Sequence, residues 1–421
     1  MNNNKLDFMN NNVPIHPLLS SDDRGSPAWW KQVKKLGNPL IYLEKNSAIC
    51  TFLWRKNTAE LTSVCIDIYT QTPTIYQQWN YFEEIQGTDI YVYCITLPSD
   101  WFGSYVIVAT PHQPPAVTDP SLRREWWTQQ LQHFSQQDPL NPYPAYTGQL
   151  ARYINRIYCN PELRSFMPNV KQQQLQWQST LLPIEPLITL LHARDIVRDE
   201  AGKTALILCL DGHIWAQFND FQKTVLDLNR QGEIGNCVLA FIPCSATLRS
   251  IHYGCHDQYC QALVEELIPF IHQHYPELTF DNTVLCGQSM GGLCAVYCSM
   301  LYPHQFNHVI GQSGSYWWSD FSNSQFQHLE ASSFLNLMEE LLKDQNRHLA
   351  LNQTKFHIST GCCETDMKQH SEVLNQLLNV QKLNSNFQQF YGGHDPLHWA
   401  ADLLTILEKL FLKQPYFNKG P

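Results

Sequence analysis

The chain has 421 residues, and its 38 acidic side chains outnumber its 28 lysines and arginines, which gives a formal net charge of −10. Because nucleic acids and anionic membranes attract basic surfaces, this charge argues against both kinds of partner. The length exceeds one ordinary hydrophobic core and suggests two domains, and a hydrophobic content of 43% is that of a globular protein.

The start of the sequence does not have the pattern of an export signal. Residues 1–8 contain no continuous apolar run, and no stretch of about 18 apolar residues, the length that a membrane helix needs, occurs later. We therefore expect a soluble, cytoplasmic protein.

The 14 cysteines are numerous enough to raise the question of a disulfide framework. The chain is large, however, and no Cys-x-x-Cys pair occurs, so reduced core thiols are the better interpretation. Cys362 and Cys363 are adjacent, a spacing that suits neither zinc nor an ordinary disulfide. Four others lie in apolar runs: Cys209, Cys286, Cys294 and Cys298.

The first part of the chain predicts an arm followed by a β domain. Residues 1–30 are rich in Asn and then in Ser, Asp and Pro, and we expect a flexible arm there, with a helix that starts near Ser26. Residues 31–150 then contain short segments of two-residue alternation, such as 48–54 and 90–95, separated by Gly, Asn and Pro. This pattern predicts an all-β, immunoglobulin-like sandwich over residues 31–150.

A region rich in Pro, Gln and Asn follows the predicted sandwich. It extends from about residue 111 to residue 185 and includes one helical pattern near Arg124. Such composition is typical of an extended connection that packs in places. We place the domain boundary inside it and predict a linker over residues 151–185.

From residue 186 to the end, strand-like and helix-like segments alternate. That order predicts a parallel sheet with crossover helices. Residues 259–274 place apolar side chains on one helical face despite Pro269. We predict an α/β-hydrolase domain with a largely parallel sheet over residues 186–421. Its strand candidates are residues 204–210, 238–243, 283–286, 308–310, 355–360 and 387–391.

The segment Gly287-Gln288-Ser289-Met290-Gly291 follows a predicted strand and precedes a helix-like run. Strand, tight turn and helix is the order of a nucleophile elbow, in which glycines allow a sharp turn without a Cβ clash. Such a turn exposes the serine hydroxyl at the carboxyl end of the strand. Ser289 is therefore the candidate nucleophile, and the alternative is an ordinary serine in a glycine-containing loop.

A serine hydroxyl needs a general base, which in this fold lies near the C-terminus. Among the 17 histidines, His394 follows the last predicted strand in the segment Gly392-Gly393-His394-Asp395. A glycine-permitted loop at that point can turn an imidazole toward the elbow, so we predict His394 as the base. A solvated turn histidine is the alternative, and His398 is a nearby competitor.

The acid of such a triad should follow the penultimate strand. Residues 355–360 are followed by Gly361-Cys362-Cys363-Glu364-Thr365-Asp366, so either Glu364 or Asp366 could orient the histidine and stabilise the imidazolium. We favour Glu364 and keep Asp366 as its rival. The alternative role for Asp366 is to cap a helix.

Acyl transfer also needs two hydrogen-bond donors for the developing oxyanion. Met290 N–H, directly after the nucleophile, is the first candidate. The second belongs to the loop at residues 210–215, where Gly212 permits close backbone approach, so we predict Gly212 or His213. Asp211 in that loop could also simply cap the next turn.

Segments in both predicted domains resemble the enterochelin esterase family, and together they span nearly the whole chain. In the second domain they are Leu210-Asp211-Gly212-x-x-Trp215-Ala216-Gln217, Gly287-Gln288-Ser289-x-Gly291-Gly292, Gln312-Ser313-Gly314-Ser315-x-Trp317-Trp318 and Gly392-Gly393-His394-Asp395. In the first they are Phe52-x-Trp54-Arg55, Gly87-Thr88-Asp89, Trp101-x-Gly103-Ser104-Tyr105 and Asp138-Pro139-Leu140-Asn141-Pro142. The serine motif is common to many esterases, whereas the first-domain set and the paired tryptophans are more specific.

The resemblance implies a cytoplasmic enzyme that hydrolyses the ester bonds of tri-catecholate siderophores such as enterobactin, so that iron is released. It implies Ser289 as nucleophile, His394 as base and Glu364 as the acid. A serine, a histidine and a carboxylate suffice for acyl transfer, so we expect no cofactor, and iron belongs to the substrate.

The resemblance also assigns a role to Arg249. It matches an arginine after the second hydrolase strand that could pair with the anionic catecholate, and a surface ion pair is the alternative. Family members usually follow this arginine with Glu-Leu and later with Asn, whereas residues 250–256 here read Ser-Ile-His-Tyr-Gly-Cys-His. We expect His252 or His256 to reshape the pocket, which leaves the particular siderophore open.

Aromatic and basic side chains complete the predicted pocket. Planar catechol rings suit indole faces, and Trp215, Trp317 and Trp318 would fall near the site in this fold. Large aromatic residues also build cores, so we expect one or two of them to line the cleft. An anionic ferric complex requires a locally positive pocket in a negative protein, and Arg55 and Arg249 are its candidates.

Two other functions remain open at this stage. The first is a feruloyl or acetyl carbohydrate esterase whose sandwich domain binds glycans, although such enzymes usually act outside the cell. The second is a non-catalytic siderophore-binding protein, which the altered stretch after Arg249 motivates. The sequence does not indicate an oligomeric state.

Overall fold

The computed structural model describes residues 16–56, 58, 60–75, 77–160, 170–182, 187–193 and 203–411. The chain divides into two compact units, Met1–Ser165 and Phe166–Pro421. Each unit is described by itself, because their positions relative to one another are not determined. Residues 1–15 of the predicted arm lie outside the described part. Within that part, no helix is long and apolar enough to cross a membrane.

The described strands of the first unit form two antiparallel sheets. One has the order β1-β2-β5-β4, and the other has the order β3-β6-β7 with β8 paired to β6. Side chains from both sheets, among them Phe52, Ile66 and Tyr105, share one buried core, which confirms the predicted all-β domain. The strands are β1 (Leu40–Leu43), β2 (Ser47–Arg55), β3 (Ser63–Ile68), β4 (Glu83–Glu84), β5 (Ile90–Pro98), β6 (Phe102–Thr110), β7 (Ser135–Gln136) and β8 (Asn155–Tyr158).

Helix α1 (Pro27–Leu36) covers the outer face of the first sheet. Its start has the expected signals, because the Ser26 side chain accepts from the Trp29 N–H at 3.1 Å and proline occupies the first turn. Trp29 and Val33 pack with Leu53 of β2 in a second buried cluster. Both faces of β2 are therefore covered, which explains why its burial does not alternate. The other helices among the described residues of this unit are η1 (Pro17–Ser20) and α2 (Pro120–Phe134).

Asp138 joins distant parts of the first unit in the protein interior. Its Oδ2 accepts hydrogen bonds from the Tyr105 hydroxyl and from Asn38 Nδ2, both at 2.6 Å, and its Oδ1 accepts from the Leu140 N–H at 2.9 Å. Burial raises the pKa of Asp138, although these hydrogen bonds act in the opposite direction. The segment Asp138–Pro142 carries part of the family resemblance. Through Asp138 it connects distant parts of this unit by hydrogen bonds.

The predicted linker over residues 151–185 contains strands. Strand β8 pairs with β6 of the first unit, whereas β9 (Gln173–Gln176) pairs with β10 (Leu187–Ala193) of the second. The change from one unit to the other therefore occurs between β8 and β9. Three of the four β9 side chains are exposed, so this polar edge strand has no hydrophobic pattern that would distinguish it from a loop.

The described strands of the second unit form an eight-stranded sheet in the order β16-β15-β14-β13-β11-β12-β10-β9. Six of them run parallel, and β10 and β9 add an antiparallel edge. All six strand candidates of the sequence are confirmed, and β12 ends directly before Pro243. The strands not yet given are β11 (Lys203–Leu210), β12 (Cys237–Ile242), β13 (Thr279–Gln288), β14 (His308–Gln312), β15 (Lys355–Gly361) and β16 (Asn384–Phe390).

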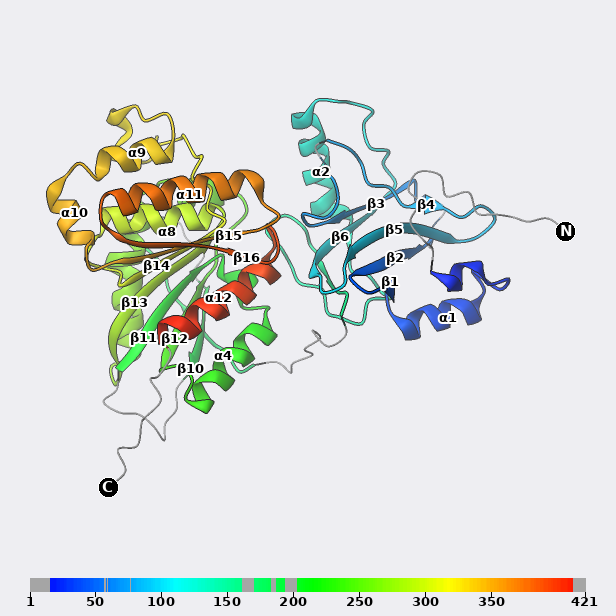
Figure 1. The fold of residues 1–421 in the computed structure, drawn as a ribbon, viewed down its shortest axis with the longest axis horizontal. Coiled ribbons are helices and arrows are strands. Elements are labelled where there is room, and N and C mark those ends of the chain that lie inside the picture. Colours follow the sequence, from blue (N-terminus) through cyan, green and yellow to red (C-terminus); the bar gives the residue numbers. More distant parts are fainter. Residues whose placement is uncertain are drawn as a thin grey trace, which may run out of the picture. The chain divides into compact units, whose positions relative to one another are not determined.

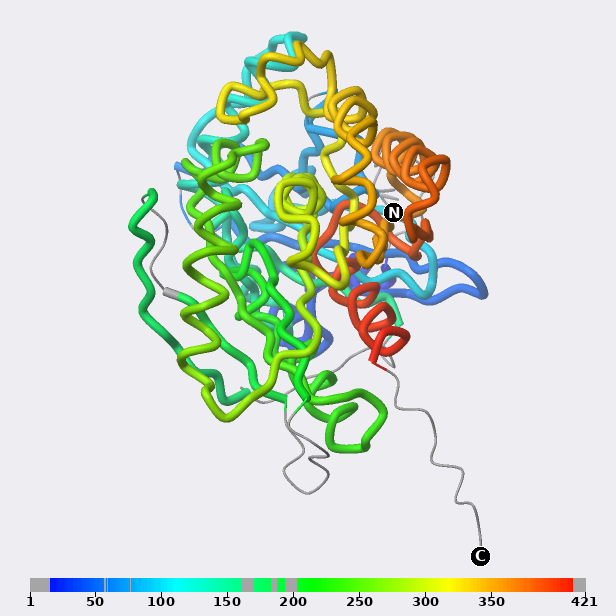
Figure 2. Tube along the Cα trace, turned by 90° about the vertical axis from the view of Figure 1, so that its left-hand side faces the viewer, coloured from blue at the N-terminus to red at the C-terminus, as the bar shows by residue number. Residues whose placement is uncertain are grey.

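Helices cover both faces of this sheet. Helices α8 and α11 lie over one face and α4 and α12 over the other (Figure 1). The same division is visible in Figure 2, where α11 is orange and α12 red. The helices are α3 (Gly212–Trp215), α4 (Asn219–Gln231), α5 (Arg249–Tyr253), α6 (Asp257–Gln261), η3 (Ala262–Leu267), α7 (Ile268–His274), α8 (Met290–Leu301), η4 (Gln327–Leu329), α9 (Phe334–Leu341), α10 (Gln345–Leu351), α11 (Thr365–Val380) and α12 (Pro396–Phe411).

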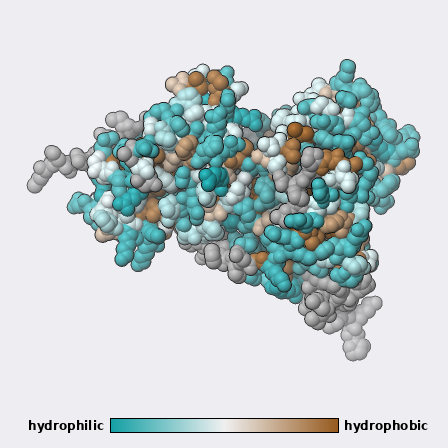
Figure 3. All heavy atoms as spheres, turned by 180° about the vertical axis from the view of Figure 1, so that it is seen from behind, coloured by the Kyte–Doolittle hydropathy of each residue, from teal (hydrophilic) through white to brown (hydrophobic). Residues whose placement is uncertain are grey.

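The predicted helix over residues 259–274 is continuous but irregular. It consists of α6, the π-helical turn η3 and α7, and the wide turn ends two residues before Pro269. A proline within a helix lacks an N–H and collides with a carbonyl of the preceding turn, so a widened turn relieves the conflict. Elsewhere the surface is mostly hydrophilic on the side that Figure 3 shows, where hydrophobic residues form small, separate groups.

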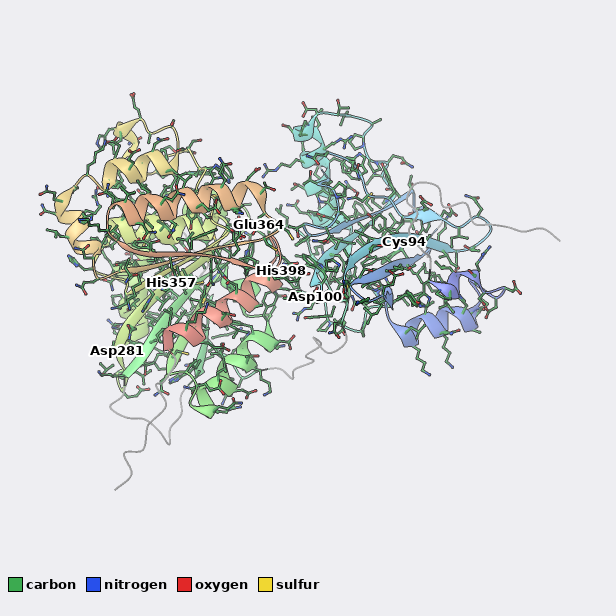
Figure 4. The ribbon with its side chains drawn as sticks, in the orientation of Figure 1. Cys94, Asp100, Asp281, His357, Glu364 and His398 are labelled. Carbon is green, nitrogen blue, oxygen red and sulfur yellow. The ribbon has the colours of Figure 1, made fainter. Side chains whose placement is uncertain are left out.

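The parallel strands bring their carboxyl ends to one edge of the second unit. In Figure 4, Glu364 and His398 lie at this edge, His357 lies within β15, and Asp281 lies near the opposite end of the strands. Loops that follow β11, β13, β14, β15 and β16 therefore converge there. Ligands of open α/β sheets bind at this edge, so the candidate site residues are sought in these loops.

We expect Asp138→Ala to destabilise the protein by about 2–4 kcal/mol, because it leaves the buried Tyr105 hydroxyl and the Leu140 N–H without an acceptor. Urea unfolding followed by tryptophan fluorescence measures the change. Asp22→Ala, at an exposed position of the same unit, is the matched control and should stay within about 0.5 kcal/mol of the parent protein. Equal stability of both variants would contradict the assigned role of Asp138.

Candidate active site

Ser289 occupies a sharp turn between β13 and α8. Its backbone has φ 57° and ψ −120°, values that a residue with a Cβ rarely adopts. The turn is tight enough that a Cβ on Gly287 would lie 2.1 Å from the Gly291 carbonyl oxygen. Ser289 remains partly exposed between buried neighbours. This is the geometry of the predicted nucleophile elbow.

The loop after β14 braces this turn from the side. The Ser289 N–H donates to the Gln312 carbonyl at 3.0 Å, and the Ser315 N–H donates to the Ser289 carbonyl at 3.0 Å. Gly292 allows the loop to approach, because a Cβ there would lie 3.1 Å from the Gly314 Cα. Backbone contacts on two sides therefore hold the strained conformation.

His394 and Glu364 are in direct contact. His394 Nδ1 and Glu364 Oε1 are 2.6 Å apart. A carboxylate only accepts hydrogen bonds, so Nδ1 carries the proton and Nε2 keeps its lone pair. Within the described residues, no hydrogen bond joins the Ser289 hydroxyl to His394, a contact that in many hydrolases tightens only when substrate is bound.

The Glu364 carboxylate lies in a dense set of donors. Its Oε2 accepts from the Ser313 hydroxyl at 2.6 Å and from the Gly361 N–H at 2.8 Å. Burial alone would raise the pKa of Glu364, but the hydrogen bond and charge of His394 and the two further donors outweigh it and lower that pKa. Glu364 therefore stays ionised at neutral pH and can stabilise an imidazolium.

Asp366, the alternative acid, and His398, the alternative base, lie in different surroundings. Asp366 is exposed in the first turn of α11, where a negative charge interacts favourably with the helix dipole. His398 is buried, and its Nδ1 accepts from the Gly393 N–H at 3.0 Å. Its ring also supports the loop closely, because a Cβ on Gly392 would lie 2.3 Å from the His398 Cγ. His398 thus supports the loop that carries His394.

The predicted oxyanion donors lie on neighbouring elements. Met290 and Gly212 are the first residues of α8 and α3, where backbone N–H groups have no partner inside the helix. The two helix starts pack together, because a Cβ on Gly291 would lie 3.5 Å from the Leu210 Cβ. Gly212 itself allows no side chain, since a Cβ there would lie 2.1 Å from the Phe241 carbonyl carbon. Gly212 and His213 both remain candidates for the second donor.

Arg249 is paired within the protein. Its Nε and Nη2 donate to the two carboxylate oxygens of Asp211 at 2.8 and 2.7 Å, and Nη2 also lies 3.3 Å from the Gln288 carbonyl. Burial acts to lower the pKa of Arg249, but the Asp211 carboxylate outweighs it and raises that pKa. Asp211 makes no side-chain cap of α3. The ion pair instead links the α3 turn to the residue before the nucleophile.

The altered stretch after Arg249 packs inward. The buried His252 stacks on Tyr259 with ring centroids 5.0 Å apart, and its pKa is lowered to about 4 by burial and by His256. His256 Nδ1 accepts from the Tyr259 N–H at the start of α6. Both histidines therefore have structural partners, and the expectation that one of them reshapes the pocket stays a prediction.

The predicted aromatic contacts separate into three cases. Trp215 is 2% exposed, and its indole N–H donates to the Leu210 carbonyl at 3.0 Å, which fits the core alternative. Trp318 is partly buried and packs beside Gly254. Trp317 is 46% exposed, so it is the most open of the three to a ligand.

Arg55 belongs to the first unit, at the end of β2. Its Nε donates to Asp89 Oδ2 at 2.6 Å, and its guanidinium lies 5.3 Å from the centroid of the Trp30 ring. Because the placement of the two units relative to one another is not determined, contact between Arg55 and a substrate held at Ser289 stays a prediction.

Sequence reasoning missed several polar residues behind the site. The Ser313 hydroxyl accepts from Trp399 Nε1 at 3.0 Å while it donates to Glu364, and the Trp399 ring packs edge-on against His394 with centroids 4.8 Å apart. Asp402 accepts from Gln312 Nε2 at 2.7 Å and from Ser359 Oγ at 2.6 Å. Trp399 and Asp402 lie on α12, and no motif identifies them. Ser313 stands in a resembling segment that had suggested no role for it.

This arrangement can support acyl transfer. It provides a partly exposed serine on a strained turn, a histidine held by an ionised carboxylate, and two helix N-termini beside the serine. Among the residues that the structure describes, no group of three or more His, Cys, Asp or Glu side chains could hold a metal ion.

Both units match known proteins. Residues 49–154 match the family model of the enterochelin esterase N-terminal domain, and residues 196–410 match that of putative esterases. The iron(III) enterobactin esterase of Dickeya dadantii is 27% identical over 93% of this chain and 94% of its own length. The iron(III) enterobactin esterase of Escherichia coli strain K12 is 25% identical over 94% of this chain and 98% of its own length. The crystal structure of the Shigella flexneri enterobactin esterase in the presence of enterobactin has a TM-score of 0.72 and 25% identity, and covers 92% of this chain and 98% of its own.

We expect Glu364→Gln to lower kcat for ester hydrolysis by about 10³–10⁴-fold with little change in KM, because a neutral amide cannot stabilise the imidazolium. Steady-state kinetics with a chromogenic ester measures the effect. Asp366→Asn, two positions along the chain, is the matched control and should keep kcat within about twofold. The opposite ranking of the two variants would identify Asp366 as the acid.

For Arg249→Met we expect a loss of about 3–5 kcal/mol of stability, because the buried Asp211 carboxylate is left unpaired. Chemical unfolding should show that Arg249→Met combined with Asp211→Asn recovers most of this loss. If the ion pair positions the α3 turn, the double variant lowers kcat more than it raises KM. A rise in KM alone would assign Arg249 to substrate binding. Arg230→Met, at an exposed ion pair, serves as the control and should change stability by less than about 1 kcal/mol.

Proposed function

The chain belongs to the enterochelin esterase family and is a carboxylic ester hydrolase, and from this premise we propose that it hydrolyses the ester bonds of a tri-catecholate siderophore. The observation that carries the proposal is the His394–Glu364 contact of 2.6 Å in the unit that presents Ser289 on a strained turn. The likeness to enterobactin esterases over more than nine-tenths of the chain supports the substrate class.

In the proposed reaction, Ser289 Oγ attacks the ester carbonyl carbon while His394 Nε2 takes its proton. The tetrahedral oxyanion is held by the Met290 N–H and by the N–H of Gly212 or His213. Collapse breaks the ester C–O bond, and the proton on His394 passes to the departing alcohol oxygen. Water, deprotonated by His394, then attacks the acyl-enzyme and releases the acid and Ser289.

Each neighbouring group has a defined part in these steps. Glu364 keeps the His394 proton on Nδ1 and stabilises the imidazolium that forms twice per cycle. The Arg249–Asp211 pair fixes the turn that carries the second oxyanion donor. No cofactor enters this sequence, and iron is part of the substrate complex, from which ester cleavage would release it in the cytoplasm.

The solved relatives support an aromatic, catechol-bearing ligand. Structures of the Shigella flexneri esterase were determined in the presence of enterobactin and of 2,3-dihydroxy-N-benzoyl-serine. In the present chain, the exposed Trp317 follows the loop that braces Ser289, and a planar catechol ring can stack on an indole face. We therefore assign Trp317 to the substrate side of the site.

The purified protein should convert enterobactin, with and without iron, into linear dihydroxybenzoyl-serine products that chromatography separates. We expect Ser289→Ala to lower the rate by about 10⁴-fold or more and to abolish labelling by a fluorophosphonate probe. Ser299→Ala, in the same helix region but buried away from the turn, is the control that should keep labelling. Absence of cleavage by the parent protein, or equal rates in Ser289→Ala, would refute the proposal. Preferred turnover of a feruloylated glycan would support a carbohydrate esterase instead.

A further inference from the structure

Two cysteines of this chain differ from all the others in accessibility. All 14 cysteines lie among the described residues; Cys362 and Cys363 are exposed, Cys94 is intermediate, and the remaining eleven are buried. Thiol reagents in solution attack accessible thiolates and leave buried ones inert. Cys362 and Cys363 are therefore the expected first targets of any thiol chemistry.

The two thiols form a close pair. Their sulfur atoms are 3.9 Å apart, and Cys362 Sγ lies 3.8 Å from the Gly392 carbonyl oxygen. Cys50 and Cys159 in the first unit are similarly close, at 3.7 Å, but both are fully buried. Of these two close pairs, the Cys362–Cys363 pair is the one that is exposed to solvent.

The pair directly precedes Glu364, the acid of the candidate triad. It occupies the turn between β15 and Glu364. The backbone of this turn is hydrogen-bonded to the segment that leads into His394. The Cys362 N–H donates to the Phe390 carbonyl at 2.9 Å, and the Cys363 N–H donates to the Gly392 carbonyl at 2.9 Å. The same two residues that carry the thiols thus join the Glu364 turn to the His394 loop.

Little space is available for these two segments to shift. A Cβ on Gly361 would lie 2.5 Å from the Gly392 carbonyl oxygen and 2.7 Å from the Gly393 Cα. Gly392 itself has φ 136°, and His398 packs against it. A change in the Cys362–Cys363 peptide therefore passes directly to the segment before His394.

We propose that Cys362 and Cys363 form a reversible thiol–disulfide modification site, whose ligand class is small disulfides, and that its oxidation disturbs the Glu364–His394 contact. One cysteine thiolate attacks a small disulfide RSSR, forms a mixed disulfide and releases RSH. The second thiolate attacks the protein sulfur of that mixed disulfide and releases another RSH. Overall, the protein dithiol loses two protons and two electrons, and one RSSR takes them up to become two RSH.

The geometry of such a ring explains both its effect and its reversibility. Adjacent Cα atoms are about 3.8 Å apart across a trans peptide, which is shorter than the roughly 4.4–6.8 Å that disulfides usually span. Ring closure must therefore rotate the backbone at Cys362 and Cys363. This rotation weakens the two hydrogen bonds that their N–H groups donate to the carbonyls of Phe390 and Gly392. Strained, exposed disulfides are easily reduced, so the change is reversible by thiols.

The effect on turnover rests on the proposed function, because it acts through Glu364 and His394. A misplacement of a catalytic group by about 1 Å can cost about 10²-fold in rate. We therefore expect oxidation to lower kcat by about that factor with little change in KM. The modification itself does not depend on the identity of the substrate.

The test treats the reduced, full-length protein with glutathione disulfide under native conditions, then alkylates the remaining accessible thiols and maps the peptides by mass spectrometry. The peptide with Cys362 and Cys363 should lose the mass of two hydrogens and resist alkylation, while the Cys50 and Cys159 peptides stay unchanged. Ester turnover and the rate of fluorophosphonate labelling of Ser289 should fall together, and dithiothreitol should restore both.

Variants separate this effect from general damage. Cys362→Ser combined with Cys363→Ser should keep activity after the same treatment, and Cys363→Ser alone should yield only the glutathione adduct of Cys362. Full labelling of Ser289 in protein shown to carry the disulfide would overturn the proposal. So would formation of glutathione adducts alone in the parent protein, or equal inactivation of the double variant.

Failure of the proposed function would look different. A reduced protein that labels with fluorophosphonate but does not cleave the siderophore would refute the substrate assignment. The effect of the disulfide could still be measured in that case, by comparing the rate of Ser289 labelling in the reduced and oxidised protein. A reduced protein that neither labels nor cleaves any ester would refute both the nucleophile and the effect on it.

Discussion

The strained backbone of Ser289 is the constraint on which the catalytic unit depends. A φ of 57° with ψ of −120° is unfavourable for a residue with a side chain, and such conformations persist only where the surroundings leave no alternative. Here Gly287 and Gly291 are in near contact, the last residue of β14 accepts from the Ser289 N–H, and the loop after β14 donates to the Ser289 carbonyl. The exposed position of the hydroxyl is the result.

A buried network of hydrogen bonds beneath the sheet edge holds the other site residues in position beside that turn. Gln288, directly before Ser289, donates to Gln312 at 2.9 Å, and Gln312 donates to Asp402 on α12 at 2.7 Å. Burial raises the pKa of Asp402 even though several donors act against it. Because buried polar groups are costly unless they are satisfied, the network fixes how α12 approaches the strands. Trp399, on the same helix, contacts both Ser313 and His394.

The features that sequence predicted well are those set by local rules. Short apolar runs that alternate with helix-like segments predicted the strands on which the site is built, and the glycine spacing around Ser289 predicted the elbow. The polar edge strand β9 was missed because its exposed glutamines carry no hydrophobic period. The partner of Arg249 was missed for a different reason, since Asp211 is 38 positions away in sequence and only the parallel pairing of β11 and β12 brings the two segments together. Ser313 and Asp402 act through long-range contacts of the same kind.

The residues after Arg249 that depart from the family pattern have structural partners inside the second unit. His252 is buried on Tyr259 and neutral at physiological pH, since its pKa is about 4, and His256 caps α6. Tyr253 from the same stretch accepts from the Asp211 N–H at 3.0 Å, so α5 supports the turn of Asp211 through its own side chains. The changed residues therefore pack in the layer behind the Asp211 turn, and Arg249 holds the Asp211 carboxylate by two hydrogen bonds. Trp317, two positions after Ser315, stays open to solvent beside this layer.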